Sequence, residues 1–142
     1  MIDRRTFKLS IIIPCYNEKN TIEEILNKIY QSLKDYEILN YEILIVDDFS
    51  NDGTKALLKN FINKDKIQIY FHDRNLGKGA AIHTALEYTT GDIIIIQDAD
   101  LEYDPKDYYK LLKPFRQKNT IAVYGSRVLG RKKVNLGFYT KN

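Results

Sequence analysis

Cysteine, methionine and tryptophan are nearly absent from this sequence, which has one cysteine, one methionine and no tryptophan in 142 residues. The single Cys15 excludes an internal disulfide framework, which fits a reducing compartment. The longest aliphatic run, Ile93–Ile96, is far shorter than the roughly 20 apolar residues that a membrane-spanning helix needs. The segment Met1–Lys8 is short and charged and leads into no apolar signal region. We therefore expect a cytoplasmic protein.

A strong charge bias is missing too. The formal net charge is only +3, and by itself it gives no reason to expect a nucleic-acid partner. With 44% hydrophobic and 29% charged residues, the composition is that of an ordinary globular protein, which excludes disorder and collagen-like repetition. The length is enough for one core and too short for two. We expect a single domain over residues 1–142, and the sequence does not indicate its oligomeric state.

Short apolar runs alternate with segments of helical periodicity along most of the chain. The apolar runs predict strands over residues 9–14, 41–46, 67–71, 92–97 and 121–124. The apolar side chains at helical spacing are Ile22, Ile25, Leu26, Ile29 and Leu33, then Leu57, Leu58, Phe61 and Ile62, then Ala81, Ile82, Ala85 and Leu86, and finally Tyr108, Leu111, Leu112 and Phe115. This alternation predicts an α/β fold, with an open, mainly parallel sheet covered by helices on both faces. The strand over 92–97 is apolar throughout and is expected to be central.

Local signals predict where several helices begin and end. Thr21 and Glu24 form a Ser/Thr-x-x-Glu pair, which is typical of a capped helix start. Asp104 followed by Pro105 predicts an N-cap and a first helical position. Gly91 predicts the end of the helix before the fourth strand, because glycine commonly stops a helix.

Polar clusters follow every predicted strand, over residues 14–18, 47–50, 72–75, 98–102 and 125–127. In a doubly wound sheet, ligands bind outside the carboxyl ends of the strands, where these clusters lie. Loops are polar in general, and for any one cluster that explanation is the better one. For all the clusters together, with acidic residues after the second and fourth strands and arginine after the third and fifth, a binding site is the better explanation. The sequence predicts an enzyme or a nucleotide-binding protein.

Asp98 and Asp100 directly follow the most apolar strand and are two residues apart. A turn after Gln97 can bring both carboxylates into one small volume, where they repel each other unless a cation joins them. Oxygen ligands of this kind suit Mg²⁺ or Mn²⁺, and Glu102 could add a third oxygen. The alternative is that Asp98 or Asp100 only caps a turn.

Asp47 and Asp48 form a second acidic pair, at the end of the second strand. One of them could accept hydrogen bonds from a nucleobase N–H group or from a ribose hydroxyl. The alternative is helix capping together with Ser50 and Asp52, and for Asp52 capping is the better explanation.

The segment 75–79 reads Asn-Leu-Gly-Lys-Gly and opens a helix, where backbone N–H groups and Lys78 can meet an anion. It is not a P-loop, because neither Ser nor Thr follows Lys78. It does not complete a dinucleotide-binding fingerprint either, because Ile82 stands at the position of the third glycine. Close packing of helix on sheet is its simplest role, and contact with an anion is the second interpretation.

The remaining candidates give weaker signals. Arg127 could meet a phosphate across the sheet edge, or it is solvated or paired with Asp100, and the sequence leaves both open. Cys15 has no evident histidine partner and is expected to be a small buried residue. His72 and His83 show no metal-ligand spacing to each other, and His83 is expected on a helix face.

Four segments, in order, resemble successive motifs of the family 2 glycosyltransferases. They are Ser10–Glu18, Val46–Thr54, Arg74–Ala81 and Gln97–Pro105. The resemblance implies the GT-A fold, a Rossmann-like arrangement of three α/β/α layers. The Asp-Ala-Asp-Leu-Glu sequence with a later Gly-Ser-Arg is most similar to the branch of dolichol-phosphate mannosyltransferases and related polyprenyl-phosphate sugar transferases.

The resemblance implies roles for particular residues. A nucleotide-sugar pocket would be lined by Pro14, Tyr16 and Glu18, with Asp48, and Asp47 beside it, at the base or ribose. Lys78 is assigned to this donor site as well. A divalent cation, Mg²⁺ or Mn²⁺, would be held by Asp98, Asp100 and Glu102. The catalytic residues would be Asp98, Asp100 and Arg127, with Arg127 facing the phosphates of the donor or acceptor.

The implied reaction is an inverting, metal-dependent transfer of a sugar from a GDP-mannose or UDP-glucose type of donor to a polyprenyl or dolichyl phosphate. The protein would then work at the cytoplasmic face of a membrane. A saccharide acceptor that is not a lipid, and a nucleotide-binding module without turnover, are the alternatives. A phosphatase of the Asp-x-Asp-x-Thr/Val type is a weaker alternative, because Glu102 stands at the Thr/Val position.

Past Arg127 the periodic pattern dissolves. Members of the family continue into acceptor-binding strands and interfacial helices, so the resemblance implies that the domain is incomplete at its C-terminus. Residues 128–142 are predicted to be a tail or the start of a missing part. Arg131, Lys132 and Lys133 are either a basic segment that faces a membrane or part of a solvated tail.

Overall fold

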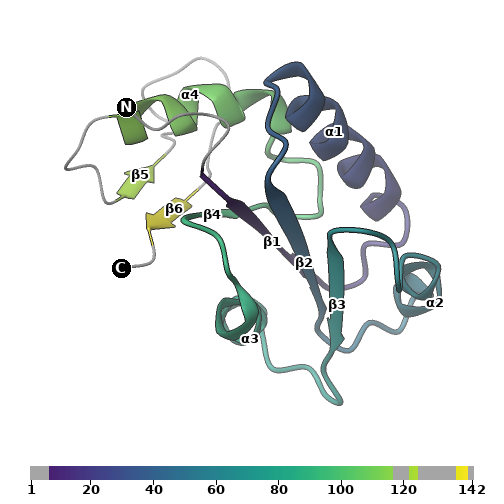
Figure 1. Cartoon of the computed structure of the whole chain (residues 1–142). Coiled ribbons are helices and arrows are strands. Elements are labelled where there is room, and N and C mark those ends of the chain that lie inside the picture. Colours follow the sequence, from purple (N-terminus) through teal and green to yellow (C-terminus); the bar gives the residue numbers. More distant parts are fainter. Residues whose placement is uncertain (1–6, 117–121, 125–136, 141–142) are drawn as a thin grey trace.

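The computed structural model describes residues 7–116, 122–124 and 137–140. Its strands are β1 (Leu9–Cys15), β2 (Tyr41–Asp47), β3 (Ile67–Phe71), β4 (Ile93–Ile96), β5 (Ala122–Tyr124) and β6 (Gly137–Thr140). Its helices are α1 (Ile22–Asp35), α2 (Thr54–Lys59), α3 (Lys78–Tyr88) and α4 (Tyr108–Leu112), and α4 is flanked by the short 3-10 helices η1 (Pro105–Asp107) and η2 (Lys113–Arg116) (Figure 1). Over the residues described, no helix combines the length and the apolar character that crossing a membrane requires.

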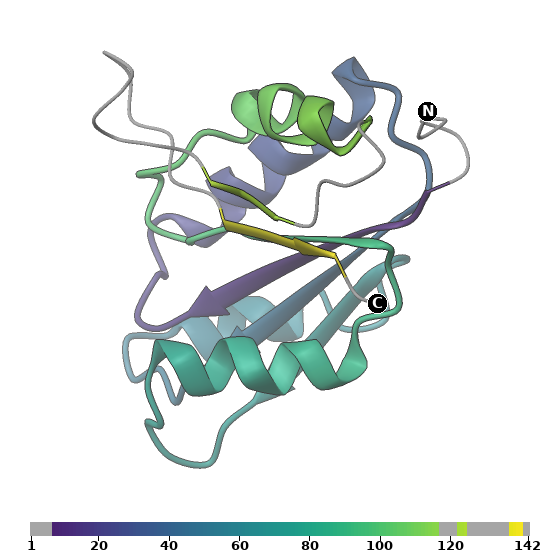
Figure 2. The same cartoon turned by 90° about the vertical axis from the view of Figure 1, so that its left-hand side faces the viewer.

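The strands form one sheet in the order β3-β2-β1-β4-β6-β5. β1 pairs in parallel with both β2 and β4, and β2 pairs in parallel with β3. The helices α1, α2 and α4 cover one face and α3 covers the other, which gives three layers (Figures 1 and 2). The predicted mainly parallel α/β architecture is therefore confirmed, and β4 is an interior strand as predicted.

Alternate residues of the strands feed two separate apolar clusters. Leu9, Ile11 and Ile13 of β1 pack with α1 in the larger cluster, whereas Ile12 packs on the opposite face with α3. This alternation is the period of two that an extended strand imposes. The smaller cluster uses Ala81 and Ala85, both fully buried, so the backbone of α3 lies close to the sheet. That close approach positions the start of α3 at the carboxyl ends of the strands.

The predicted capping pair of Thr21 and Glu24 is wrong, although α1 does begin directly after Thr21. The Thr21 side chain makes no capping hydrogen bond to the helix. Its hydroxyl instead donates to Glu18 Oε2 over 2.7 Å, and Glu24 lies 3.7 Å from Lys28 Nζ. A capping hydroxyl accepts from a backbone N–H group of the first turn, whereas the Thr21 hydroxyl is turned away to donate to the Glu18 carboxylate, a charge-assisted bond.

Helix α2 is shorter than its apolar pattern predicts, because it ends at Lys59, before Phe61 and Ile62. Its first N–H groups include that of Thr54, which donates to Asp52 Oδ1 over 2.9 Å, so the predicted capping role of Asp52 is confirmed. After Lys59 the backbone hydrogen bonds run from residue i to i−3, the tighter pattern that ends many helices.

The predicted fifth strand is confirmed as β5, whereas the predicted tail differs from the structure. β5 pairs with β6, which is antiparallel and also pairs with β4. Residues 137–140 therefore belong to the sheet, and the prediction of a tail over 128–142 is wrong for them; residues 128–136 and 141–142 lie outside the described part. The physical reason is that β6 pairs the open edge of β4, a contact that no local pattern reveals.

Gly91 does not end α3, which stops at Tyr88 and is followed by the extended residue Thr89. Its role is instead close approach to β1. A Cβ atom at Gly91 would be 2.8 Å from the Lys8 carbonyl oxygen and from Ser10 N, and it would collide with Ser10 Oγ. The Gly91 N–H group also donates to Ser10 Oγ over 2.8 Å. A side chain at this position would push the entry of β4 away from β1.

The variant Gly91→Ala is expected to lower the free energy of unfolding by about 2 kcal/mol, because its methyl group overpacks this contact. Denaturation in urea measures the change. Gly79→Ala is the matched control, since a Cβ at Gly79 meets nothing within 4 Å and alanine is the better helix former in α3. Equal stability of the two variants would contradict the prediction.

Candidate functional site

A cavity of about 330 Å³ opens at the carboxyl ends of the parallel strands, within the range of roughly 300–1,000 Å³ that is usual for ligand pockets. It is lined by Pro14, Cys15, Tyr16, Asp48, Asn75, Gly77, Lys78, Ala81, Asp98, Ala99 and Asp100. These residues lie at the end of β1, after β2, β3 and β4, and at the start of α3. The chain passes from β1 to β2 on one side and adds β4 on the other, so the cavity lies at the switch point where such sheets bind ligands.

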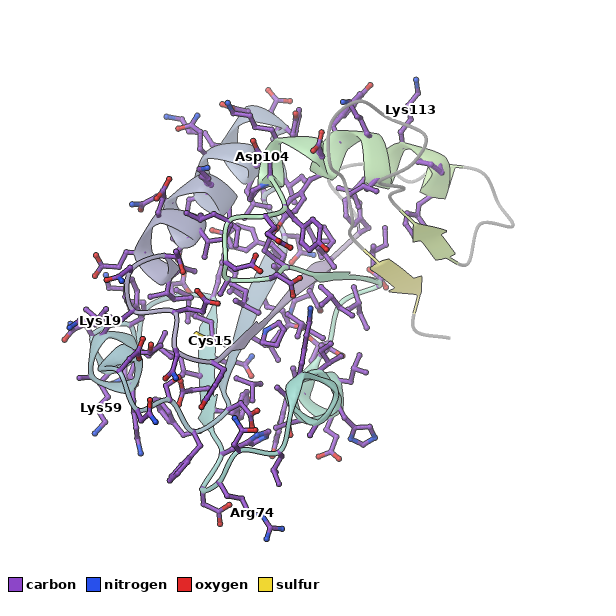
Figure 3. The ribbon with its side chains drawn as sticks, turned by 180° about the vertical axis from the view of Figure 1, so that it is seen from behind. Cys15, Lys19, Lys59, Arg74, Asp104 and Lys113 are labelled. Carbon is purple, nitrogen blue, oxygen red and sulfur yellow. The ribbon has the colours of Figure 1, made fainter. Side chains whose placement is uncertain are left out.

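The end of β1 and the residue after it contribute Pro14, Cys15 and Tyr16 to the cavity, and Glu18 does not line it. In Figure 3, Cys15 lies between the helices α2 and α3 at the end of β1. The Cys15 side chain is buried, as predicted, and burial together with the Asp47 carboxylate raises the pKa of its thiol. Glu18 turns toward the start of α1, where its carboxylate accepts from Thr21. The structure therefore does not bring Glu18 to the predicted pocket.

The acidic pair after β2 divides into two roles. Asp47 is fully buried, accepts from the backbone N–H and the hydroxyl of Ser50, and does not line the cavity. Asp48 lines the cavity, and its two oxygens accept from the N–H groups of Leu76 and Gly77, each over 2.8 Å. The Asp48 carboxylate thus holds the loop that precedes α3.

Burial alone would raise the pKa of Asp48. Hydrogen bonds from the Leu76 and Gly77 N–H groups and from His72 outweigh it, and the pKa of Asp48 is lowered below its ordinary value. The Asp48 side chain is therefore a carboxylate at neutral pH. In this structure both carboxylate oxygens accept from the loop. A base or ribose that binds Asp48 would therefore use an oxygen that also holds the loop.

Lys78 is the first residue of α3 and reaches the carboxylate after β4. Its Nζ lies 2.5 Å from Asp98 Oδ1, and both residues line the cavity. The preceding Gly77 has a φ of 94°, a conformation that suits glycine and lets the chain turn into the helix. The cavity thus contains a cation beside an acid at a helix N-terminus, where an anion is favoured.

The turn after β4 brings Asp98 and Asp100 to the same cavity and leaves Glu102 outside it. The Glu102 N–H group donates to Asp100 Oδ1 over 3.0 Å, and Leu101 between them has a φ of 66°. Within residues 7–116, 122–124 and 137–140, no three acidic, histidine or cysteine side chains are placed to hold a metal ion together. The predicted trio of Asp98, Asp100 and Glu102 is therefore not assembled among these residues, and Glu102 meets Asp100 through its backbone N–H group.

Two carboxylates on one cavity still fit a divalent cation of the Mg²⁺ class. Such a cation is usually held by one or two carboxylates, with phosphate oxygens and water as its other ligands. Asp98 and Asp100 supply the carboxylates here, and one oxygen of each is engaged, by Lys78 and by the Glu102 N–H group. Arg127, Arg131, Lys132 and Lys133 lie outside the described residues.

A buried network that the sequence did not reveal supports this turn. Gln97 Nε2 donates to the carbonyl oxygens of Tyr103 and Asp98, over 2.9 and 3.1 Å, and Gln97 Oε1 accepts from the Tyr108 hydroxyl over 2.8 Å. Gln97 and Tyr108 are fully buried, and burial raises the pKa of Tyr108 well above its ordinary value. A polar glutamine directly after four isoleucines was the available signal.

The variant Tyr108→Phe is expected to lower the free energy of unfolding by about 1–2 kcal/mol, because Gln97 Oε1 loses its donor inside the core. Chemical denaturation checks this value. Tyr88→Phe serves as the control, since Tyr88 is 47% exposed and its change should stay within about 0.5 kcal/mol. An unchanged Tyr108→Phe variant would mean that the network carries little of the stability.

His72 is a second polar residue for which the sequence gave no role. It follows β3, and its ring lies between the cavity residue Asp48 and Thr84 of α3. His83, by contrast, is on the exposed face of α3, as predicted. Arg74, at the tip of the loop between β3 and α3, points outward (Figure 3).

Two relatives match most of this chain. It is 33% identical, over 94% of its length, to the dolichol-phosphate mannosyltransferase of Pyrococcus furiosus. It is 32% identical, over 77% of its length, to the undecaprenyl-phosphate 4-deoxy-4-formamido-L-arabinose transferase of Aeromonas hydrophila. The chain spans 37% and 34% of the lengths of these two proteins, about a third of each.

The fold is similar to that of a solved glycosyltransferase. The mannosyltransferase from Pyrobaculum calidifontis, in complex with GDP-Man and Mn2+, superposes with a TM-score of 0.71 over 95% of this chain and 45% of its own, at 24% identity. At that identity the likeness shows the fold, which is the expected GT-A type. The sequence profile described as Glycosyl transferase family 2 matches residues 10–142, nearly the whole chain. The chain therefore belongs to family 2 of the glycosyl transferases.

Proposed function

We propose that this chain forms the donor-binding half of a metal-dependent, inverting glycosyltransferase. The donor is a nucleotide sugar of the GDP-mannose or UDP-glucose type, and the acceptor is a polyprenyl or dolichyl phosphate at the cytoplasmic face of a membrane. One observation carries the proposal: Asp98, Asp100 and Lys78 meet in a single cavity at the switch point of the sheet. An acidic pair with a cation beside it, at a helix N-terminus, suits a diphosphate with its metal ion.

The relatives support the choice of donor and acceptor. Two of them are named as transferases that act with dolichol phosphate or undecaprenyl phosphate. The similarly folded mannosyltransferase was solved with GDP-Man and Mn2+. Each name describes that protein, and the shared family and fold extend its chemistry to this chain as a proposal.

The described residues divide the work of binding the donor. Pro14 and Tyr16 border the nucleotide, and Asp48 holds the loop that carries Lys78 to the diphosphate. Asp98 and Asp100 hold Mg²⁺ or Mn²⁺, which when bound neutralises charge on the departing nucleoside diphosphate. Arg127, which lies outside the described residues, is assigned to the phosphates by the family resemblance alone.

The proposed reaction exchanges one bond at the sugar for another. An acceptor phosphate oxygen forms a bond to the anomeric carbon as the bond from that carbon to the donor diphosphate breaks. The acceptor oxygen is already anionic, so no strong protein base is needed to remove a proton.

Calorimetric titration with UDP and with GDP, each in Mn²⁺ and in EDTA, tests the donor site. We expect one nucleotide to bind in Mn²⁺, and its affinity to fall by about tenfold or more in EDTA and in Asp100→Asn. Asp107→Asn is the control, because Asp107 pairs with Lys110 and does not line the cavity. Binding of neither nucleotide by the folded chain would contradict the donor site.

Two further outcomes separate the parts of the proposal. Equal nucleotide affinity in Mn²⁺ and in EDTA would contradict the role of the metal and would still support the nucleotide site. Transfer of radiolabelled sugar to a polyprenyl phosphate, measured on the full-length chain, distinguishes an enzyme from a binding module without turnover.

A further inference from the structure

The His72 ring is enclosed between three elements of the fold. Its side chain is 9% exposed, follows β3, and does not line the cavity. Its Nδ1 lies 2.8 Å from Asp48 Oδ1, after β2, and its Nε2 lies 2.9 Å from Thr84 Oγ1, in α3. Both ring nitrogens are therefore engaged, and the ring ties the end of β2 to the middle of α3.

The protonation of the ring follows from its partners. Asp48 is a carboxylate and can only accept, so Nδ1 of His72 donates to it. In the neutral ring Nε2 then accepts from the Thr84 hydroxyl, an assignment made from the hydrogen-bond network. Asp48 Oδ1 consequently receives two hydrogen bonds, one from His72 and one from the Leu76 N–H group.

Asp48 transmits this orientation to the loop. Its other oxygen accepts from the Gly77 N–H group, and its carbonyl oxygen accepts from the Asn75 side chain over 3.3 Å. Lys78 is the next residue along the chain and points to Asp98. The direction of the Asp48 carboxylate thus decides where the first turn of α3 and its lysine lie.

We propose that His72 is a positioning residue of the donor site, acting through Asp48 on the loop 75–78. The inference rests on the proposed function for its effect on nucleotide affinity, whereas its effect on the loop stands without it. His72 is not a base or a metal ligand in this scheme, because both nitrogens are engaged and the ring lies behind Asp48, outside the cavity.

Amide hydrogen exchange at Leu76 and Gly77, measured by NMR without nucleotide, tests the effect on the loop. In His72→Ala we expect both amides to exchange about tenfold faster, because Asp48 loses the bond that orients it. The Kd of the nucleotide that binds the wild-type chain in Mn²⁺ should rise by about the same factor, since an anchored loop binds at a lower entropic cost. His83→Ala, in an exposed position on α3, should change neither quantity.

A pair of conservative variants separates positioning from general stability. The amide nitrogen of His72→Asn can take the place of Nδ1 and should restore both slow exchange and affinity. The amide of His72→Gln reaches the place of Nε2, toward Thr84, and should restore neither. Thr84→Val, which keeps the bond between His72 and Asp48, should resemble the wild type more closely than His72→Gln does.

Equal behaviour of the Asn and Gln variants would overturn the inference, as would wild-type exchange in His72→Ala. If His72→Ala does not fold, the comparison of the Asn, Gln and Thr84→Val variants decides. If the wild-type chain binds no nucleotide, the proposed function fails, and the exchange of Leu76 and Gly77 still decides whether His72 positions the loop.

Discussion

Asp48→Asn is expected to lower the free energy of unfolding by about 3 kcal/mol and to weaken nucleotide binding by about a hundredfold. Asp48 is 3% exposed, and its carboxylate accepts from two backbone N–H groups and from His72. An asparagine has the same shape but one acceptor oxygen. Its NH₂ group would replace either Oδ1, which accepts from His72 and Leu76, or Oδ2, which accepts from Gly77. At least one of these N–H groups would therefore lose its acceptor. Urea denaturation and calorimetry measure the two effects.

The control for this variant removes the same charge from the surface close by. Asp73 is exposed and follows His72 directly, so Asp73→Asn should leave the unfolding midpoint and the affinity near their wild-type values. If Asp48→Asn and Asp73→Asn have the same unfolding midpoint in urea, the Asp48 carboxylate does not hold the loop in the way its distances indicate.

Glu42→Ala is expected to have the largest effect on stability, a loss of about 4 kcal/mol. Glu42 is 4% exposed and lies at the opposite end of the sheet from the cavity. Its carboxylate accepts from Ser10 Oγ and the Thr90 N–H group, each over 2.6 Å, and lies 3.3 Å from Lys8 Nζ. Alanine would remove the acceptor shared by these donors and leave the fully buried Ser10 hydroxyl without it. Denaturation in urea at neutral pH measures the loss.

The same carboxylate predicts how stability depends on pH. Burial would raise the pKa of Glu42, but hydrogen bonds from Ser10 and Thr90 and the charge of Lys8 outweigh it and lower the pKa. The unfolded chain therefore takes up its proton first, at the ordinary pKa of about 4.3. The stability that Glu42 contributes is complete above that pH, and it is lost as the pH falls through the lower pKa of the folded chain.

We therefore expect wild-type stability to fall below about pH 4 more steeply than that of Glu42→Gln, which has no charge to lose. Denaturation midpoints from pH 7 to pH 3 check this. Glu24→Gln, on the exposed face of α1, should follow the wild-type curve. Parallel curves for Glu42→Gln and the wild type would contradict the contribution of the buried carboxylate.

Much of the fold could be predicted because most of its strands are short apolar runs that neighbouring residues in the sequence are enough to identify. The runs before Pro14, Asp47, His72 and Gln97 became β1 to β4 within about one residue at each end, because isoleucine-rich segments between polar clusters have few alternatives. β6 could not be found this way. Its partner β4 lies far back in the chain, and pairing across that distance depends on backbone edges rather than on side-chain pattern.

The candidate site was predictable to the level of strand ends but not of single side chains. Parallel strands bring their carboxyl ends together, so Tyr16, Asp48 and Asp98 reach one cavity. Asp47 and Glu102 do not line it: the Asp47 carboxylate accepts from the N–H group and hydroxyl of Ser50, and the Glu102 N–H group donates to Asp100. Side-chain hydrogen bonds position His72 and Gln97, to Asp48 and Thr84 and to Tyr103 and Tyr108 respectively, and such bonds have no periodicity in sequence.

The position of β6 in the sheet fixes an order of assembly. β6 lies between β4 and β5 although it follows both in the chain, so neither can gain this neighbour until residues 137–140 have left the ribosome. The parallel unit from β3 to β4 can condense earlier on its own contacts. During that interval β4 presents an unpaired row of N–H and C=O groups along four isoleucines, the kind of edge on which nascent chains associate with one another. Among the strands that the structure describes, the latest in the chain is thus the one that pairs this edge of β4.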